Sequence, residues 1–74
     1  MITADKLTLL INMPTAMLEQ ALPKKNRPKL QTRRFLGITN GGEFCYNVID
    51  EAGTHSKVFL KYDPTADKVS ATLA

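Results

Sequence analysis

The sequence predicts an α+β fold, in which an N-terminal helical segment packs on one face of a three- to four-stranded antiparallel meander sheet. Apolar residues recur at helical spacing before Pro23, and they alternate every two residues after Gln31. Residues typical of tight turns separate the alternating stretches. Because the 74 residues contain no linker or repeat, we expect a single domain over residues 1–74.

Two short helices are predicted at the N-terminus. Thr3 or Asp5 can cap a helix over about Ala4 to Asn12, because their side-chain oxygens accept hydrogen bonds from free backbone N–H groups. The run LTLLI could also be a buried strand, since periodicity does not separate the two. Pro14 suits the first turn of a second helix, PTAMLEQAL, which ends before Pro23.

Four alternating stretches follow, and each predicts a strand: RRFLGIT, EFCYNVI, KVFLKYD and KVSATL. Between them lie Asn-Gly-Gly at residues 40–42, Glu-Ala-Gly-Thr at 51–54 and Asp-Pro-Thr-Ala-Asp at 63–67. In the last of these, Asp63 can accept hydrogen bonds from turn amides, and Pro64 has the backbone angle that a turn needs. Consecutive hairpins of this kind give a meander.

The first hairpin has two candidate registers. A two-residue Asn-Gly turn would send Leu36 and Ile38 to the polar face of the sheet. In a three-residue loop, Gly42 is left-handed and Ile38 pairs with Phe44. Leu36 then pairs with Tyr46, and the apolar residues share one face. We therefore expect the three-residue loop.

The predicted core joins the helices to the apolar face of the sheet. The helical contribution is Leu7, Leu10, Ile11, Met17, Leu18 and Leu22. The sheet contribution is Leu36, Ile38, Phe44, Tyr46, Val48, Val58, Leu60, Tyr62, Val69 and Leu73. Each of these side chains stabilises the fold by roughly 1.5–3 kcal/mol when it is fully buried.

Positive charge is concentrated in one part of the chain, residues 23–34, which we call the basic segment. Its six cations are Lys24, Lys25, Arg27, Lys29, Arg33 and Arg34, and it contains no acidic residue. The rest of the chain has four Lys and seven acidic residues, so its net charge is −3 within a formal total of +3. A negatively charged partner would therefore be attracted to one zone of the surface.

These charges predict a small, non-enzymatic binding module that contacts an acidic partner, with nucleic acid preferred. Two prolines would keep the basic segment extended, so that its charges could follow a phosphate backbone. Phe59 lies between Lys57 and Lys61 on the predicted open face, where it could stack on a base. We include these three residues in the predicted partner-binding site.

A protein partner is the alternative. An acidic protein surface could contact the basic segment, and an edge strand or sheet face could pair with a partner or with a second copy in a homodimer. An inhibitor or accessory protein of a phage or another mobile element would have this character. Affinity that falls steeply with salt would favour nucleic acid, whereas a shallow salt dependence would favour protein.

The sequence lacks patterns for catalysis, metals or cofactors, and we predict none of them. Cys45 and His55 are single residues with no orienting partner, and together they cannot supply the four ligands of a structural zinc. The run NGGE joins two strands instead of opening a helix, so it is no phosphate loop. The second predicted helix carries no cation, which argues against a helix-turn-helix.

The cellular location follows from cysteine content and hydropathy. A lone cysteine excludes an internal disulfide. The apolar run from Leu7 to Ile11 is too short to span a membrane, and the N-terminus lacks the features of a signal peptide. We therefore expect a cytoplasmic protein that has no membrane partner.

The stretch VIDEAGTHSKVFLKYDPTADKV, from Val48 to Val69, resembles the paired-strand half of PepSY-type domains. Its markers are an acid-and-glycine turn between two strands and an Asp-Pro turn into a last strand, with Asp67 where a glycine would be usual. The resemblance covers under a third of the chain. It implies paired hairpins, and we carry over no function from it.

Overall fold

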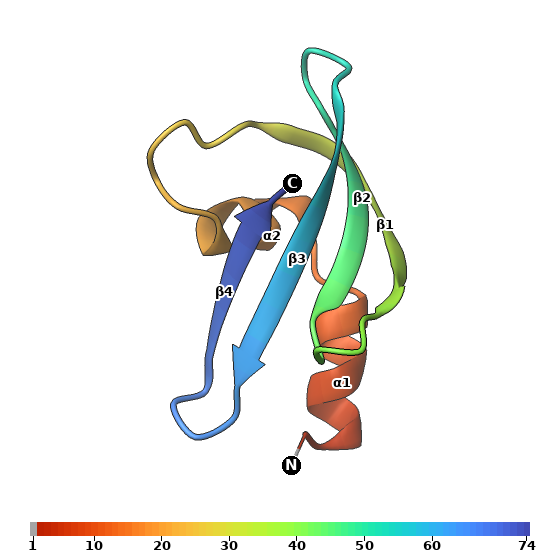
Figure 1. Ribbon diagram of the computed structural model, residues 1–74, viewed down its shortest axis with the longest axis vertical. Coiled ribbons are helices and arrows are strands. Elements are labelled where there is room, and N and C mark those ends of the chain that lie inside the picture. The colour runs from red at the N-terminus through yellow and green to blue at the C-terminus, as the bar shows by residue number, and fades with distance from the viewer. Residues whose placement is uncertain (1) are drawn as a thin grey trace.

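The computed structural model describes residues 2–74 and confirms the α+β class (Figure 1). The helices are α1, Ala4–Ile11, and α2, Thr15–Ala21; the strands are β1, Leu30–Ile38, β2, Phe44–Asp50, β3, His55–Asp63, and β4, Lys68–Leu73. The strands form one antiparallel sheet in the order β1-β2-β3-β4, and both helices lie on the same side of it (Figure 1). Within the described chain, neither helix has the length and hydropathy that crossing a membrane requires.

α1 begins after a capping threonine, and α2 begins after a proline. The Thr3 side chain accepts a hydrogen bond from the Lys6 backbone N–H at 3.2 Å, so Thr3 is the N-cap and Asp5 lies in the first turn of α1. The run LTLLI is therefore helix and not strand. Pro14 stands at the N-cap of α2, just before its first turn.

The first hairpin has the predicted three-residue loop. Ile38 pairs with Phe44, and Gly42 has a left-handed φ of 80°. The predicted pairing of Leu36 with Tyr46 is wrong, because Phe35 pairs with Tyr46 instead. A β-bulge between Phe35 and Gly37 leaves Leu36 without a partner in β2.

This bulge decides which side chains of β1 reach the core. The ring of Phe35 packs with its centroid 5.5 Å from that of Tyr46 and 6.2 Å from that of Phe44. Leu36 and Ile38, which we predicted in the core, are 49% and 52% exposed. The alternation in the sequence would place either Phe35 or Leu36 inward, and the bulge selects Phe35.

The core lies between the helices and the sheet. Its buried members are Leu10, Met13, Leu18, Leu22, Leu30, Phe44, Tyr46, Val48, Val58, Leu60 and Ala71. Two further predictions were wrong, since Met17 is 51% and Leu73 is 43% exposed. Met17 lies about 100° round α2 from the inward Leu18. Leu73 ends β4, which is an edge strand and has no neighbour beyond it.

The other two hairpins close through their aspartates, as predicted for Asp63. One oxygen of Asp63 accepts hydrogen bonds from the backbone N–H groups of Thr65 and Ala66 at 3.0 and 3.4 Å. Asp67, at the position where glycine is usual, has a φ of 51°. In the preceding hairpin, the Asp50 side chain accepts from two turn amides at 3.0 and 2.9 Å. These hydrogen bonds stabilise the turns that join β2 to β3 and β3 to β4.

Candidate functional site

The basic segment does not run straight. Between its two prolines the chain turns at Asn26, which has a left-handed φ of 58°, so the prediction of an extended connection is wrong. Lys25 lines a hollow with Leu73 of β4, whereas Arg34 lies on β1, at the opposite edge of the sheet. Figure 1 shows the α2–β1 connection passing beyond β4 before the chain crosses to β1. The six cations are therefore divided between two edges.

Arg27 binds the end of α2. Its Nη2 donates hydrogen bonds to the backbone carbonyls of Leu22 at 2.6 Å and Gln20 at 3.3 Å. The last turn of α2 has no basic residue of its own, so the Arg27 guanidinium supplies positive charge where the helix dipole is negative. This side chain therefore stabilises the end of α2.

Arg33 binds the segment between the helices. Its Nε donates to the Met13 carbonyl at 2.6 Å, and its Nη2 donates to the Asn12 carbonyl at 3.2 Å. Asn12 is the C-cap of α1, which also has no basic residue in its last turn. Arg33 therefore holds the α1–α2 junction against β1.

We call the side of the sheet that faces away from the helices the open face. The side chain of Arg34 lies on it. Side chains alternate along a strand, so Arg33 points to the helices and Arg34 to the open face. The remaining cations of the basic segment, Lys24, Lys25 and Lys29, are exposed on or beside the α2–β1 connection.

Three further predicted residues share the open face with Arg34. Arg34 pairs with Asn47, and Asn47 pairs with Lys57, so these residues form one row across the sheet. Phe59 and Lys61 follow Lys57 on the same face of β3, because they lie two and four residues further along. We call Arg34, Lys57, Phe59 and Lys61 the open-face cluster. Its three cations are exposed, and Phe59 is half-buried.

The cations of the open-face cluster have no carboxylate partner. The one ion pair among residues 2–74 joins Lys6 to Asp67 at the far end of the β3–β4 hairpin, with 3.0 Å between nitrogen and oxygen. Positive charge in the cluster is therefore available to an external anion. The cluster thus combines an aromatic surface with unneutralised cations.

A shallow hollow of about 290 Å³ lies beside the cluster, at the β1 edge. Lys57 and Cys45 line it together with Leu36, Gly37, Ile38 and Thr39. A side chain at Gly37 would meet nothing within 4 Å, so this glycine leaves open space above the strand. Cys45 pairs directly with Phe59, so the hollow and Phe59 lie on the same face of the sheet, and a flat apolar group could occupy the hollow.

The sequence analysis did not predict this hollow, because the hollow depends on the bulge in β1. An isolated glycine inside a strand pattern is the one available signal, since such glycines often mark bulges or close approaches. Gly37 in RRFLGIT fits this signal.

The structure does not bring Cys45 and His55 together. His55 pairs with Ile49, which is four residues from Cys45 along β2, and four residues of strand span about 13 Å. Cys45 is buried beneath the open face, where it serves as a small apolar filler. Residues 2–74 contain no group of three or more His, Cys, Asp or Glu side chains that could hold a metal ion.

Comparisons with protein-family models, with curated proteins and with solved structures found no match to this chain. The likeness of residues 48–69 to PepSY-type domains therefore gains no support from a family model.

Proposed function

We propose that the protein is a small binding module that holds single-stranded nucleic acid on the open face of its sheet, without reading the base sequence. The observation that supports this most is the open-face cluster: one aromatic ring, Phe59, between Lys57 and Lys61, with Arg34 across the sheet. The cations would contact phosphates, and the ring would stack on a base.

A single strand fits this surface better than a duplex. Stacking on Phe59 needs a base whose face is free, and bases in a duplex are already stacked on each other. The hollow beside Cys45 gives a neighbouring base a second apolar surface. A duplex would offer only its phosphates to the three cations, so it would bind more weakly.

The salt dependence of binding tests the electrostatic part of this proposal. We would measure the fluorescence anisotropy of a labelled mixed-sequence single strand at several salt concentrations. Three phosphate contacts predict that log K falls with log salt with a slope of about −2, since each contact to a single strand contributes about −0.7. Equal affinity for the matching duplex would contradict the stacking contribution of Phe59.

Two cluster variants separate charge from stacking. Lys57→Ala combined with Lys61→Ala removes two contacts, so the slope should become shallower by about 1.4. Phe59→Ala should weaken binding about 5- to 150-fold and leave the slope unchanged, because stacking on an aromatic side chain contributes about 1–3 kcal/mol per base.

The α2–β1 connection supplies a matched control. Lys24→Ala with Lys25→Ala removes the same charge outside the open-face cluster, and we expect affinity to change less than twofold. If this control weakens binding as much as the cluster variant does, the open face is not the site. Arg27 is unsuitable for such a test, because its loss would also expose the carbonyls at the end of α2.

A further inference from the structure

β4 is an edge strand of the sheet, with no strand beyond it. Ala74 and Lys57 exchange two backbone hydrogen bonds, at 2.8 and 3.3 Å, so they form a hydrogen-bonded pair. In an antiparallel ladder, such pairs alternate with pairs whose backbone groups point outward. By this alternation, Val69, Ala71 and Leu73 direct their N–H and C=O groups away from β3, where no other strand lies.

The other edge of the sheet is less suited to pairing. β1 is interrupted by irregularities between Leu30 and Thr32 and again between Phe35 and Gly37. Bulges of this kind twist an edge away from a regular ladder and discourage added strands. The pairing of β4 with β3 has no register shift. β4 is therefore the continuous edge, and an extended chain could add to it.

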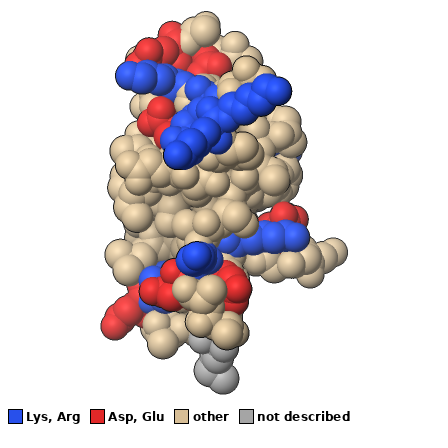
Figure 2. All heavy atoms as spheres, turned by 90° about the vertical axis from the view of Figure 1, so that its left-hand side faces the viewer, with Lys and Arg blue, Asp and Glu red and all other residues tan. Residues whose placement is uncertain are grey.

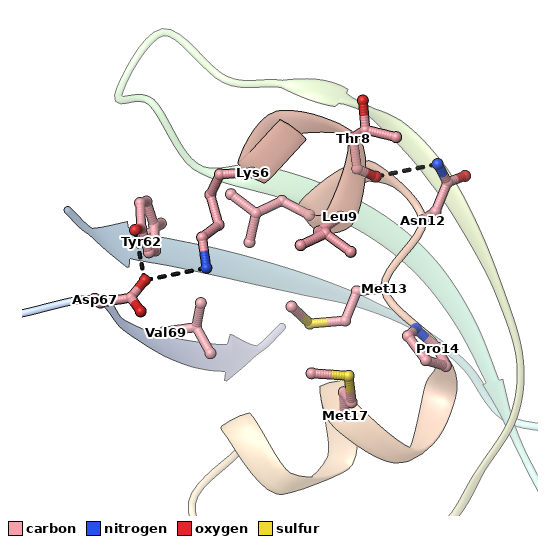
Figure 3. Close-up of a pocket in the computed structure, with 11 residues that line it drawn as sticks. Lys6, Thr8, Leu9, Asn12, Met13, Pro14, Met17, Tyr62, Asp67 and Val69 are labelled. Carbon is pink, nitrogen blue, oxygen red and sulfur yellow. Dashed lines mark hydrogen bonds and ion pairs between the residues drawn. The ribbon is translucent and has the colours of Figure 1, made fainter. Parts of the chain in front are cut away.

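An apolar groove of about 460 Å³ opens beside the start of β4, between α1, α2 and the β3–β4 hairpin (Figure 3). Leu9 of α1 is 64% exposed, and Met17 of α2 is half-exposed. In Figure 3, these side chains and Met13 face Val69 across the groove. Methionine is flexible, so such a groove can adapt to different large apolar side chains.

A polar contact closes one end of this groove. The Lys6 Nζ lies 3.0 Å from the Asp67 carboxylate, and the Tyr62 hydroxyl donates to the same oxygen at 2.7 Å (Figure 3). The Lys6 Nζ also lies 5.3 Å from the centre of the Tyr62 ring. Asp67 is thus occupied by two neighbours, and the groove contributes no free anion.

A second hollow, of about 380 Å³, lies at the other end of β4. Lys25, Asn26 and Arg27 line it together with Thr72 and Leu73. Lys25 is exposed and has no ion-pair partner among the residues that the structure describes. Seen from the β4 side, a broad band without charged residues separates groups of Lys, Arg, Asp and Glu at the two ends (Figure 2).

We propose that β4 and the two adjoining hollows bind an extended segment of a partner protein, which adds to the sheet as a fifth strand. The segment carries a large apolar side chain opposite Val69 and, four residues away on the same face, an Asp or Glu opposite Leu73. Four residues of strand span about 13 Å, the separation of these two positions along β4. The apolar side chain enters the groove, and the carboxylate pairs with Lys25.

Other occupants match the surface less well. Nucleic acid lacks the regular N–H and C=O spacing of a strand and has no large aliphatic group for the groove. A second copy of this chain, paired symmetrically through β4, would bring the Lys68 end of one copy to Lys25 of the other. Val69 of that copy would then stand opposite Leu73, where the proposed segment carries its carboxylate, so Lys25 would gain no charged partner at this position. An acidic partner supplies that carboxylate.

Synthetic peptides with blocked ends test the proposal. The probe for antiparallel addition is Thr-Asp-Thr-Val-Thr-Phe-Thr, and the reversed order tests parallel addition. A control peptide, Thr-Asp-Thr-Val-Phe-Thr-Thr, places the acid and the phenyl group on opposite faces. In NMR titrations of the intact protein, one probe order should shift the amide signals of Val69, Ala71 and Leu73 and bind at least tenfold more tightly than the control peptide.

Variants of the protein test whether the two hollows bind the side chains of the probe. Met17→Lys changes an exposed residue, so folding should persist, yet binding of the preferred probe should weaken at least tenfold. Leu36→Lys, at a similarly exposed residue on β1, is the matched control and should leave binding unchanged. Lys25→Glu should weaken binding of the probe that contains Asp. The same variant should bind a probe in which Lys replaces Asp.

Several results would overturn the proposal. These are no binding of either probe order at about 1 mM, equal binding of the control peptide, or signal shifts confined to the open face. A native mass of two chains that Met17→Lys reduces to one would assign the edge to a second copy. Met17→Lys should leave nucleic-acid affinity unchanged, so this proposal and the proposed function can fail separately.

Discussion

At the scale of single residues, the arginines of the basic segment have two different roles. The guanidinium groups of Arg27 and Arg33 bind backbone carbonyls of α2 and of the α1–α2 junction. Arg34, next in the chain to Arg33, faces solvent on the open face. Charge alone could be read from the sequence, whereas the partner of each charge depends on how the chain folds back, over 5 and 7 positions for Arg27 and over 20 and 21 positions for Arg33.

Arg33→Lys tests the structural role of Arg33. Arginine donates to the two carbonyls from two nitrogens in fixed positions, and the single nitrogen of lysine cannot reproduce the geometry of both bonds to Asn12 and Met13. We expect the free energy of unfolding to fall by about 1.5–3 kcal/mol, the range for hydrogen bonds of charged groups.

Urea unfolding followed by circular dichroism measures this loss. Arg34→Lys is the control, since Arg34 makes no side-chain hydrogen bond within residues 2–74, and it should change stability by less than about 0.5 kcal/mol. Equal losses for the two variants would mean that the carbonyl contacts of Arg33 contribute little.

At the scale of elements, local turn chemistry could be read from the sequence and the register of β1 could be read only in part. Asp63 and Gly42 act within a few residues of themselves, so their roles follow from local sequence. The bulge at Leu36 reflects a competition between two apolar neighbours for one inward position. Packing of Phe35 against Tyr46 decides that competition, and the isolated Gly37 is the one local sign of the bulge in the sequence.

Gly37→Ala tests the bulge. Gly37 has a φ of 146°, which residues with a side chain rarely adopt, although there is open space around it. We expect a loss of about 1–3 kcal/mol in the free energy of unfolding from backbone strain. Gly41→Ala is the control, because its new methyl group would make only ordinary contacts at 3.8 and 3.9 Å. It should change stability by less than about 0.5 kcal/mol.

A second readout separates strain from a general loss of stability. If the bulge holds Phe35 inward, Gly37→Ala should also alter the ring-current shifts of Tyr46 in NMR spectra. If both the stability and the Tyr46 shifts are unchanged, Gly37 is not required for the bulge that holds Phe35 inward.

At the scale of the whole molecule, one tyrosine links the helical layer to the sheet. The buried hydroxyl of Tyr46, on β2, donates to the Leu10 carbonyl of α1. Burial raises the pKa of Tyr46 to about 12, and the positive charge of Arg33 acts in the opposite direction. Because the pKa in the folded state lies above the ordinary value of 10.0, this contribution to stability is complete below pH 10 and is lost as pH rises towards 12.

At acid pH, the pH dependence of the free energy of unfolding includes a contribution from Asp67. The hydrogen bond from Tyr62 and then the contact with Lys6 hold the pKa of Asp67 below its ordinary 3.8. A lowered pKa means that this contribution is present above pH 3.8 and is lost as pH falls below it. The same hydrogen bond raises the pKa of Tyr62.

Tyr46→Phe should therefore change the shape of the stability profile. At pH 7 we expect the free energy of unfolding to fall by about 0.5–1.5 kcal/mol, because one hydrogen bond is lost. Between pH 10 and 12 the variant should lose less stability on titration than the parent protein does. Urea unfolding at a series of pH values checks both, and parallel profiles would contradict the assigned role of the hydroxyl.

The placement of the helix-binding groups also bears on how the chain acquires structure during synthesis. Helices of eight and seven residues are too short to persist alone, since isolated helices need about 12–15 residues. The groups that bind their ends, Arg27, Arg33 and Tyr46, all leave the ribosome after the helices themselves. The first third of the protein therefore emerges first, but it becomes ordered only once the strands that follow it have been made.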